Sequence, residues 1–143
     1  MRQKLRLSLL CTLLFLPGLL TASENFDGKW HTKIVCPPKG NTEGFTWNFD
    51  SVIANGSLRG VRGTEGQPGS FVLDGKIKDD GSAKLSGNGI INSRAYARGV
   101  FARKGEDYTW EIKAQFKDGK GTGLRNEGLG IVGRPCTFEF EKE

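Results

Sequence analysis

Histidine is nearly absent from this sequence, which contains only His31 among its 143 residues. A catalytic metal site needs three or more protein ligands, and a nucleophilic centre needs a base beside its nucleophile. Cysteine does not supply these groups, because one of the three cysteines lies in an apolar run at the start of the chain and the other two are expected to pair. A nucleophile-elbow motif is also missing. We therefore predict a non-enzymatic protein that holds neither a metal nor a cofactor.

Two further shortages limit the fold and the partners. From residue 25 onward, no stretch of ten or more residues shows the apolar period of a helix. Lysine and arginine are scattered among acidic residues and do not form the basic, aromatic-rich groove that binds nucleic acid. Three of the 21 Lys and Arg, and none of the 16 Asp and Glu, lie in the first 23 residues, so the remaining net charge is +2. We predict an all-β domain that does not bind nucleic acid.

The first 23 residues are predicted to be a secretory signal peptide. Three basic residues precede an apolar run over residues 7–20, and small residues follow at the expected cleavage position after residue 22 or 23. The run has about 14 residues and contains Pro17-Gly18, so it is too short for a stable membrane anchor, which needs roughly 20 residues. We expect export to the periplasm or the extracellular space, with residues 24–143 forming one domain.

Apolar residues alternate with polar ones in the candidate strands. Between residues 108 and 116, the aromatic and aliphatic residues occupy the even positions, as in a half-buried antiparallel strand. Tight-turn pairs such as Asn55-Gly56, Asp80-Gly81 and Asp118-Gly119 separate these runs, so successive strands should form hairpins. The candidate strands cover residues 28–36, 44–54, 57–64, 70–78, 82–91, 95–104, 107–117, 120–126 and 134–142.

Cys36 and Cys136 predict how this meander closes. They are the cysteines that remain after removal of the signal peptide, and an even number in an exported chain favours a disulfide. Cys36 ends the first candidate strand and Cys136 stands near the start of the last, so antiparallel pairing of these strands would bring the two sulfurs together.

The expected fold is an antiparallel up-and-down meander closed into a barrel of roughly eight strands. Closure of a simple antiparallel meander needs an even number of strands, whereas the sequence offers nine candidates. We therefore expect one glycine-rich candidate, 57–64 or 120–126, to be a bend or a loop. The 21 glycines are consistent with the strong curvature of a small closed barrel.

An eight-stranded meander with Gly28-x-Trp30 in its first strand resembles the calycin group, which includes the lipocalins and avidins, and the small bacterial metalloprotease inhibitors have a similar barrel. Residues 25–30 resemble the first lipocalin motif, and Asp107-Tyr108 resembles the second. The resemblance implies that an arginine on the last strand packs against the tryptophan of the first strand. Arg125 and Arg134 are the candidates for this arginine, and Arg134 lies nearer to the paired strand.

The alternation places Trp30, Trp47 and Trp110 on the inward faces of their strands. There they either line an apolar pocket or fill a solid core, since eight strands enclose room for side chains or for one small ligand. We take these tryptophans as candidate ligand-binding residues, together with Tyr108 and Arg134. Thr32 and Ser51 also face inward, as pocket groups or as partners of the backbone.

The sequence leaves three functions open. The first is a secreted binding protein that holds a small apolar ligand in the barrel mouth. The alternative is a module that binds an exported protein, such as a protease inhibitor that uses residues 24–28 or a hairpin edge. A solid barrel with a structural role in the cell envelope is the third. Asn55-Gly56-Ser57 fits a glycosylation sequon, although turn chemistry explains these residues equally well.

Overall fold

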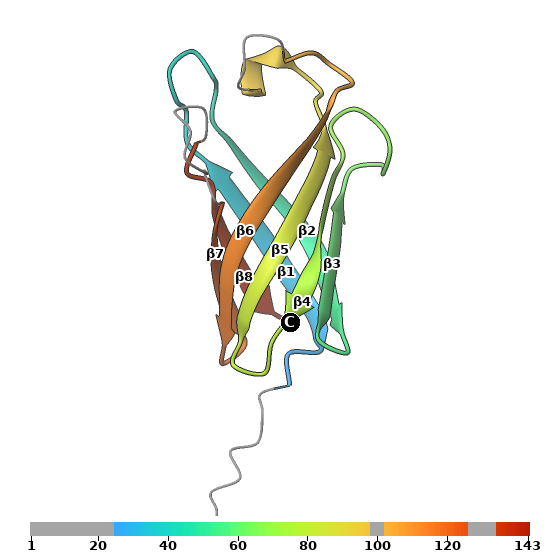
Figure 1. Ribbon diagram of the computed structural model, residues 1–143, viewed down its shortest axis with the longest axis vertical. Coiled ribbons are helices and arrows are strands. Elements are labelled where there is room, and N and C mark those ends of the chain that lie inside the picture. The colour runs from blue at the N-terminus through green and yellow to red at the C-terminus, as the bar shows by residue number, and fades with distance from the viewer. Residues whose placement is uncertain (1–24, 98–101, 126–133) are drawn as a thin grey trace, which may run out of the picture.

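The computed structural model describes residues 25–97, 102–125 and 134–143, so the predicted signal peptide lies outside the described residues. Eight antiparallel strands pair in chain order and close into one barrel, which confirms the predicted fold class (Figure 1). The strands are β1 (Gly28–Cys36), β2 (Phe45–Ala54), β3 (Ser57–Arg62), β4 (Phe71–Ile77), β5 (Ser82–Ile90), β6 (Asp107–Lys117), β7 (Lys120–Arg125) and β8 (Thr137–Lys142).

The barrel closes through β1 and β8, as the cysteines predicted. Val35 pairs with Thr137 in the antiparallel ladder, so the end of β1 lies beside the start of β8. The Cys36–Cys136 disulfide lies next to this pair, with an S–S distance of 2.02 Å and a Cα–Cα distance of 4.2 Å. Both cysteines are buried. The bridge therefore ties the first strand to the last at one end of the barrel.

The expectation about the surplus strand was wrong. Both glycine-rich candidates are strands, β3 and β7, whereas the candidate at 95–104 is not a strand in its described part. Residues Arg94–Tyr96 form a single 3₁₀ turn, which the Ser93 side chain caps by accepting a hydrogen bond from the Ala95 N–H. Residues 98–101 lie outside the described residues. β5 and β6 pair directly with each other along nine residues, so the candidate at 95–104 does not stand between them as a strand of the barrel.

The two ends of the barrel differ in their connections. At one end, tight turns join β2 to β3, β4 to β5 and β6 to β7. Asn55 and Asp118 adopt φ values of 50° and 51° there, each followed by a glycine at positive φ, as two-residue hairpins require. The connections 37–44 and 63–70 and the described part of 91–106 lie at the opposite end, uppermost in Figure 1. We call the tight-turn end the closed end and the other end the mouth.

The closed end is solid. Trp30 is fully buried, and its ring packs edge-on against Phe116 at a centroid distance of 5.4 Å. The Trp30 indole N–H donates to the main-chain carbonyl of Phe26 at 2.8 Å, and the buried Phe26 ring lies against Phe116. Gly121 makes room for Phe116, because a Cβ at this position would lie 2.7 Å from the phenylalanine ring. Among the described residues, packed rings therefore fill this end of the barrel.

Candidate functional site

A cavity of about 680 Å³ opens at the mouth. Its walls come from the mouth-side ends of β2, β3, β5, β6 and β7 and from the adjoining connections. This volume lies within the range of roughly 300 to 1,000 Å³ that is typical of small-molecule sites. The barrel is therefore solid at one end and hollow at the other.

One wall of the cavity is aromatic. Phe45 and Trp47 stack at a centroid distance of 4.3 Å, and Trp47 lies almost parallel to Trp110, with 8° between their planes and 6.2 Å between their centroids. Tyr108 continues the wall at 5.3 Å from Trp110. Strand alternation gives this arrangement, because Phe45 and Trp47 are two residues apart on β2, as are Tyr108 and Trp110 on β6. The wall is a preformed set of flat apolar surfaces.

Glycines on β5 give these rings their space. Gly89 pairs with Tyr108, and a Cβ on Gly89 would lie 2.3 Å from the tyrosine hydroxyl oxygen. Gly87 pairs with Trp110, and its Cβ would lie 2.4 Å from the ring of Phe71, which packs beneath the aromatic wall. The rings of Tyr108 and Phe71 thus occupy the space that side chains at positions 89 and 87 of β5 would fill.

Three arginines line the same cavity, and each lies over an aromatic ring. The guanidinium carbon of Arg62 is 4.4 Å from the centroid of Trp47, that of Arg125 is 4.5 Å from Trp110, and that of Arg134 is 4.8 Å from Phe45. These distances are within the range of cation–π attraction.

Arg134 and Arg62 are further held by the main chain. Arg134 is 2% exposed and donates to the carbonyl oxygens of Glu43 and Tyr96. Arg62 donates from Nη1 to the carbonyl of Gly69 at 2.7 Å. Two of the cationic heads are therefore fixed in position by the mouth connections.

Tyr108 lies among these charges. Burial raises the pKa of the Tyr108 phenol to about 12, while the positive charges of Arg62, Arg125 and Arg134 act in the opposite direction. The phenol therefore keeps its proton at neutral pH and has an O–H to donate.

The structure brings together four of the five residues predicted for ligand binding. Trp47, Tyr108, Trp110 and Arg134 all line the mouth cavity. Trp30 does not, because it pairs with Ser51 and Lys142 near the closed end. Trp30 and Arg134 thus lie at opposite ends of the barrel, and the arginine–tryptophan contact implied by the lipocalin resemblance is not formed between them.

Sequence reasoning did not select Arg62 or Phe45 as site residues. Strand alternation was the available signal for Arg62, because Leu58 and Gly60 face the interior and Arg62 continues their series to the mouth. Phe45 was placed on the same face as Trp47 but was not taken as a site residue. Arg125 was considered only as a partner for Trp30.

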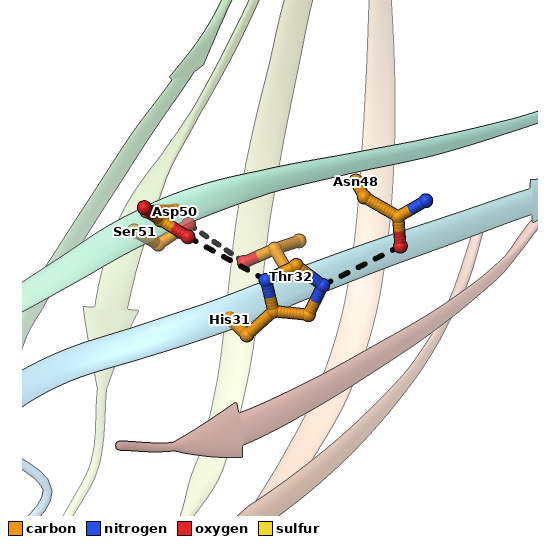
Figure 2. A network of polar contacts seen from close by, with 5 residues as sticks. All are labelled: His31, Thr32, Asn48, Asp50 and Ser51. Carbon is orange, nitrogen blue, oxygen red and sulfur yellow. Dashed lines mark hydrogen bonds and ion pairs between the residues drawn. The ribbon is translucent and has the colours of Figure 1, made fainter.

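The inward polar residues Thr32 and Ser51 form a buried pair below the cavity. Their hydroxyl oxygens are 2.7 Å apart, and both residues are at most 1% exposed. Figure 2 shows this pair on one side of the β1–β2 ribbon. The two hydroxyl groups form a hydrogen bond with each other, and neither residue lines the cavity.

His31 lies on the opposite face of the same strands (Figure 2). Its Nδ1 is 3.5 Å from Asp50 Oδ1, and its Nε2 is 3.4 Å from Asn48 Oδ1. Ser51 is adjacent to Asp50 in sequence, but its hydroxyl points inward to Thr32, so the sheet separates it from the imidazole. Serine, histidine and aspartate are near one another here without the geometry of a nucleophilic triad.

The described residues contain no group of three or more His, Cys, Asp or Glu side chains arranged to hold a metal ion. No helix in the described part of the chain is long and apolar enough to cross a bilayer. Comparisons of the chain with protein-family models, curated proteins and solved structures find no match. The calycin resemblance stays a prediction, and the mouth cavity is the feature from which function is inferred below.

Proposed function

We propose that this is a secreted, non-enzymatic binding protein that holds a small, largely apolar ligand in the mouth of its barrel. The observation that carries the proposal is the aromatic-walled cavity of about 680 Å³ above a solid core. An occupant would cover the partly exposed rings of Phe45, Trp47 and Tyr108. Burial of apolar surface provides the main driving force for such binding.

The construction of the barrel suits this role. The closed end is rigid because its turns are short and its rings interlock, while the connections at the mouth surround the cavity. Binding residues often lie on such connections, positioned by a stable scaffold. A ligand that enters a preformed cavity loses less free energy to ordering of the protein. The mouth therefore combines access with a fixed shape.

Export is part of the proposal and has separate support. The predicted signal peptide would direct the chain out of the cytoplasm. The disulfide between Cys36 and Cys136 is consistent with an oxidising compartment. We place the protein in the periplasm or outside the cell.

The alternative, capture of an exported protein through residues 24–28, gains no support from the described residues of that segment. Phe26 is 6% exposed and packs into the core. The Asp27 carboxylate accepts the main-chain N–H groups of Asn55 and Gly56 at 2.8 and 3.0 Å. To bind a partner protein, this segment would have to give up both the core packing of Phe26 and the hydrogen bonds that Asp27 accepts from the turn.

The neutral fluorescent probe N-phenyl-1-naphthylamine tests the proposal. Its emission should rise on binding to the oxidised protein, saturating at one probe per chain. Trp47→Leu should weaken binding several-fold because it removes part of the aromatic wall. Val52→Ala is the matched control, because Val52 lies on the same strand, is 50% exposed and points outward. The absence of saturable binding by this probe and by a panel of apolar and amphipathic ligands would refute the proposal.

A further inference from the structure

The mouth cavity is strongly cationic for its size. Arg62, Arg125 and Arg134 line it, and the described lining residues include no aspartate or glutamate. On the outer face, by contrast, cations form salt bridges with glutamates: Arg59 with Glu65 at 2.8 Å and Lys33 with Glu139 at 3.1 Å. The domain without its predicted signal peptide has a net charge of only +2. Positive charge is therefore concentrated in this aromatic cavity.

The arginine geometry suits an anion. A guanidinium that stacks on a ring through its face directs its N–H donors outward in its own plane, and this planar edge matches a carboxylate, sulfonate or phosphate. The guanidinium carbon of Arg62 lies over Trp47 at 4.4 Å from the ring centroid, and the Gly69 carbonyl holds one of its terminal nitrogens. The aromatic wall and the cationic groups thus belong to one surface and would contact the same occupant.

Three positive charges act at one place. The Tyr108 phenol experiences the field of all three arginines, and each of them favours negative charge there. The phenol itself remains neutral because burial outweighs this field, so it offers a donor and not a competing anion. An anionic group beside Tyr108 would meet three cations and one O–H donor in a partly desolvated cavity, where charge interactions are stronger than in water.

We infer that the ligand is an organic acid, a small molecule with a flat apolar body and one anionic head. The body packs against the partly exposed rings of Phe45 and Trp47, and the arginines of the mouth bind the head beside Tyr108. This inference rests on the proposed function and narrows its ligand class. It requires that the cavity discriminate between an acid and a neutral molecule of the same shape.

Two dyes make this comparison. 8-Anilino-1-naphthalenesulfonate and N-phenyl-1-naphthylamine share one aromatic skeleton, and only the first carries a sulfonate. We expect the sulfonate dye to bind the oxidised full domain at one site, at least as tightly as the neutral dye. The two dyes should compete. High salt should weaken the sulfonate dye alone, because salt screens its attraction to the arginines.

Arginine variants isolate the contribution of charge. Arg62→Gln and Arg125→Gln should each weaken the sulfonate dye about tenfold, which corresponds to one charge-assisted contact, and should weaken the neutral dye much less. Arg59→Gln is the matched control, because Arg59 is on the same strand as Arg62 but pairs with Glu65 on the outer face. Arg134 is not varied, since its bonds to two main-chain carbonyls hold the mouth together.

The outcomes separate the inference from the proposed function. Equal binding of both dyes, unchanged by Arg62→Gln and Arg125→Gln, would overturn the inference and leave the binding function standing. Failure of both dyes to bind would overturn the two together. An arginine variant that weakens both dyes equally would assign the residue to the shape of the wall and would also overturn the inference. Selective loss of the sulfonate dye supports it.

Discussion

Replacement of both bridging cysteines by alanine should lower the free energy of unfolding by about 4 to 5 kcal/mol. Cys36 and Cys136 are 100 residues apart in the chain. In the chain-entropy model, a closed loop of about this length restricts the unfolded state enough to give roughly 4.7 kcal/mol. That amount is comparable to the total stability of many small domains, about 5 to 15 kcal/mol. The bridge is thus expected to decide whether the barrel is robust or marginal.

The loss of packing around the two sulfurs should lower the free energy of unfolding further, by a smaller amount. Cys36 and Cys136 are 1% and 0% exposed, so each alanine leaves a small void where a sulfur was. The β1–β8 ladder remains available to close the barrel, since six residue pairs from Trp30 to Val35 join these strands. We therefore expect the variant to fold, with an unchanged far-ultraviolet spectrum and a lower urea midpoint.

Urea titrations of three samples measure this effect: oxidised wild type, fully reduced wild type and the double-alanine variant. Reduced wild type should unfold close to the variant, because both lack the covalent constraint. Equal midpoints for the oxidised protein and the variant would refute the reasoning. If reduction left the wild-type midpoint unchanged while the variant was destabilised, the effect would belong to packing and not to the bridge.

Three further substitutions test the interior. Thr32→Val should cost about 1 to 3 kcal/mol in a urea titration because it leaves the Ser51 hydroxyl buried without a partner, and adding Ser51→Ala should recover part of that loss. Gly87→Ala should cost about 1 to 3 kcal/mol, since its Cβ would lie 2.4 Å from Phe71; a second change, Phe71→Leu, should relieve the clash, and additive losses would argue against this contact. The pKa of Tyr108 is raised to about 12 in the folded state, above the unfolded value near 10. The contribution of the protonated phenol to the free energy of unfolding is therefore complete below pH 10 and disappears as pH rises toward 12. Tyr108→Phe should lack that loss, of about 2 kcal/mol, and parallel pH profiles for the two proteins would contradict it.

Most of the fold was predictable because its information is local. Alternation along each strand decides which side chains face inward, and turn pairs such as Asn55-Gly56 connect neighbouring strands. The one long-range relation, closure of β1 onto β8, was available from two cysteines near the ends of the domain. The predicted bounds of β1 and β6 agree with the structure at both ends.

The surplus strand shows where local information fails. Residues 95–104 were a candidate strand in the sequence, but a strand needs a partner as well as a suitable local sequence. The ladder from Ser82 with Gln115 to Ile90 with Asp107 already joins β5 to β6. Which strand edges are already paired is a property of the whole sheet, so alternation within one segment cannot reveal it.

The sequence predicted which side chains of the candidate site face inward, but not where they lie along the barrel axis. Trp30 and Trp47 both face inward, yet Trp30 pairs with Ser51 near the closed end and Trp47 pairs with Ile34 toward the mouth. Alternation assigns a face of the sheet and says nothing about the distance from either end of the barrel. Only the register of the ladders separates a core tryptophan from one that lines the cavity.

The net charge of the domain gives no sign of the three arginines at the mouth. A net charge of +2 describes a nearly neutral domain, whereas the barrel gathers three cations in one cavity by ending β3 and β7 with Arg62 and Arg125 and by placing Arg134 just before β8. A charged residue at the end of a strand is ordinarily solvated. These arginines line the cavity only because of two features of the closed sheet. β3 and β7 each end on an inward position, and both of these ends lie at the mouth together with the start of β8. The same geometry that separates a solid end from a hollow one thus also determines the sign of the charge that lines the hollow end.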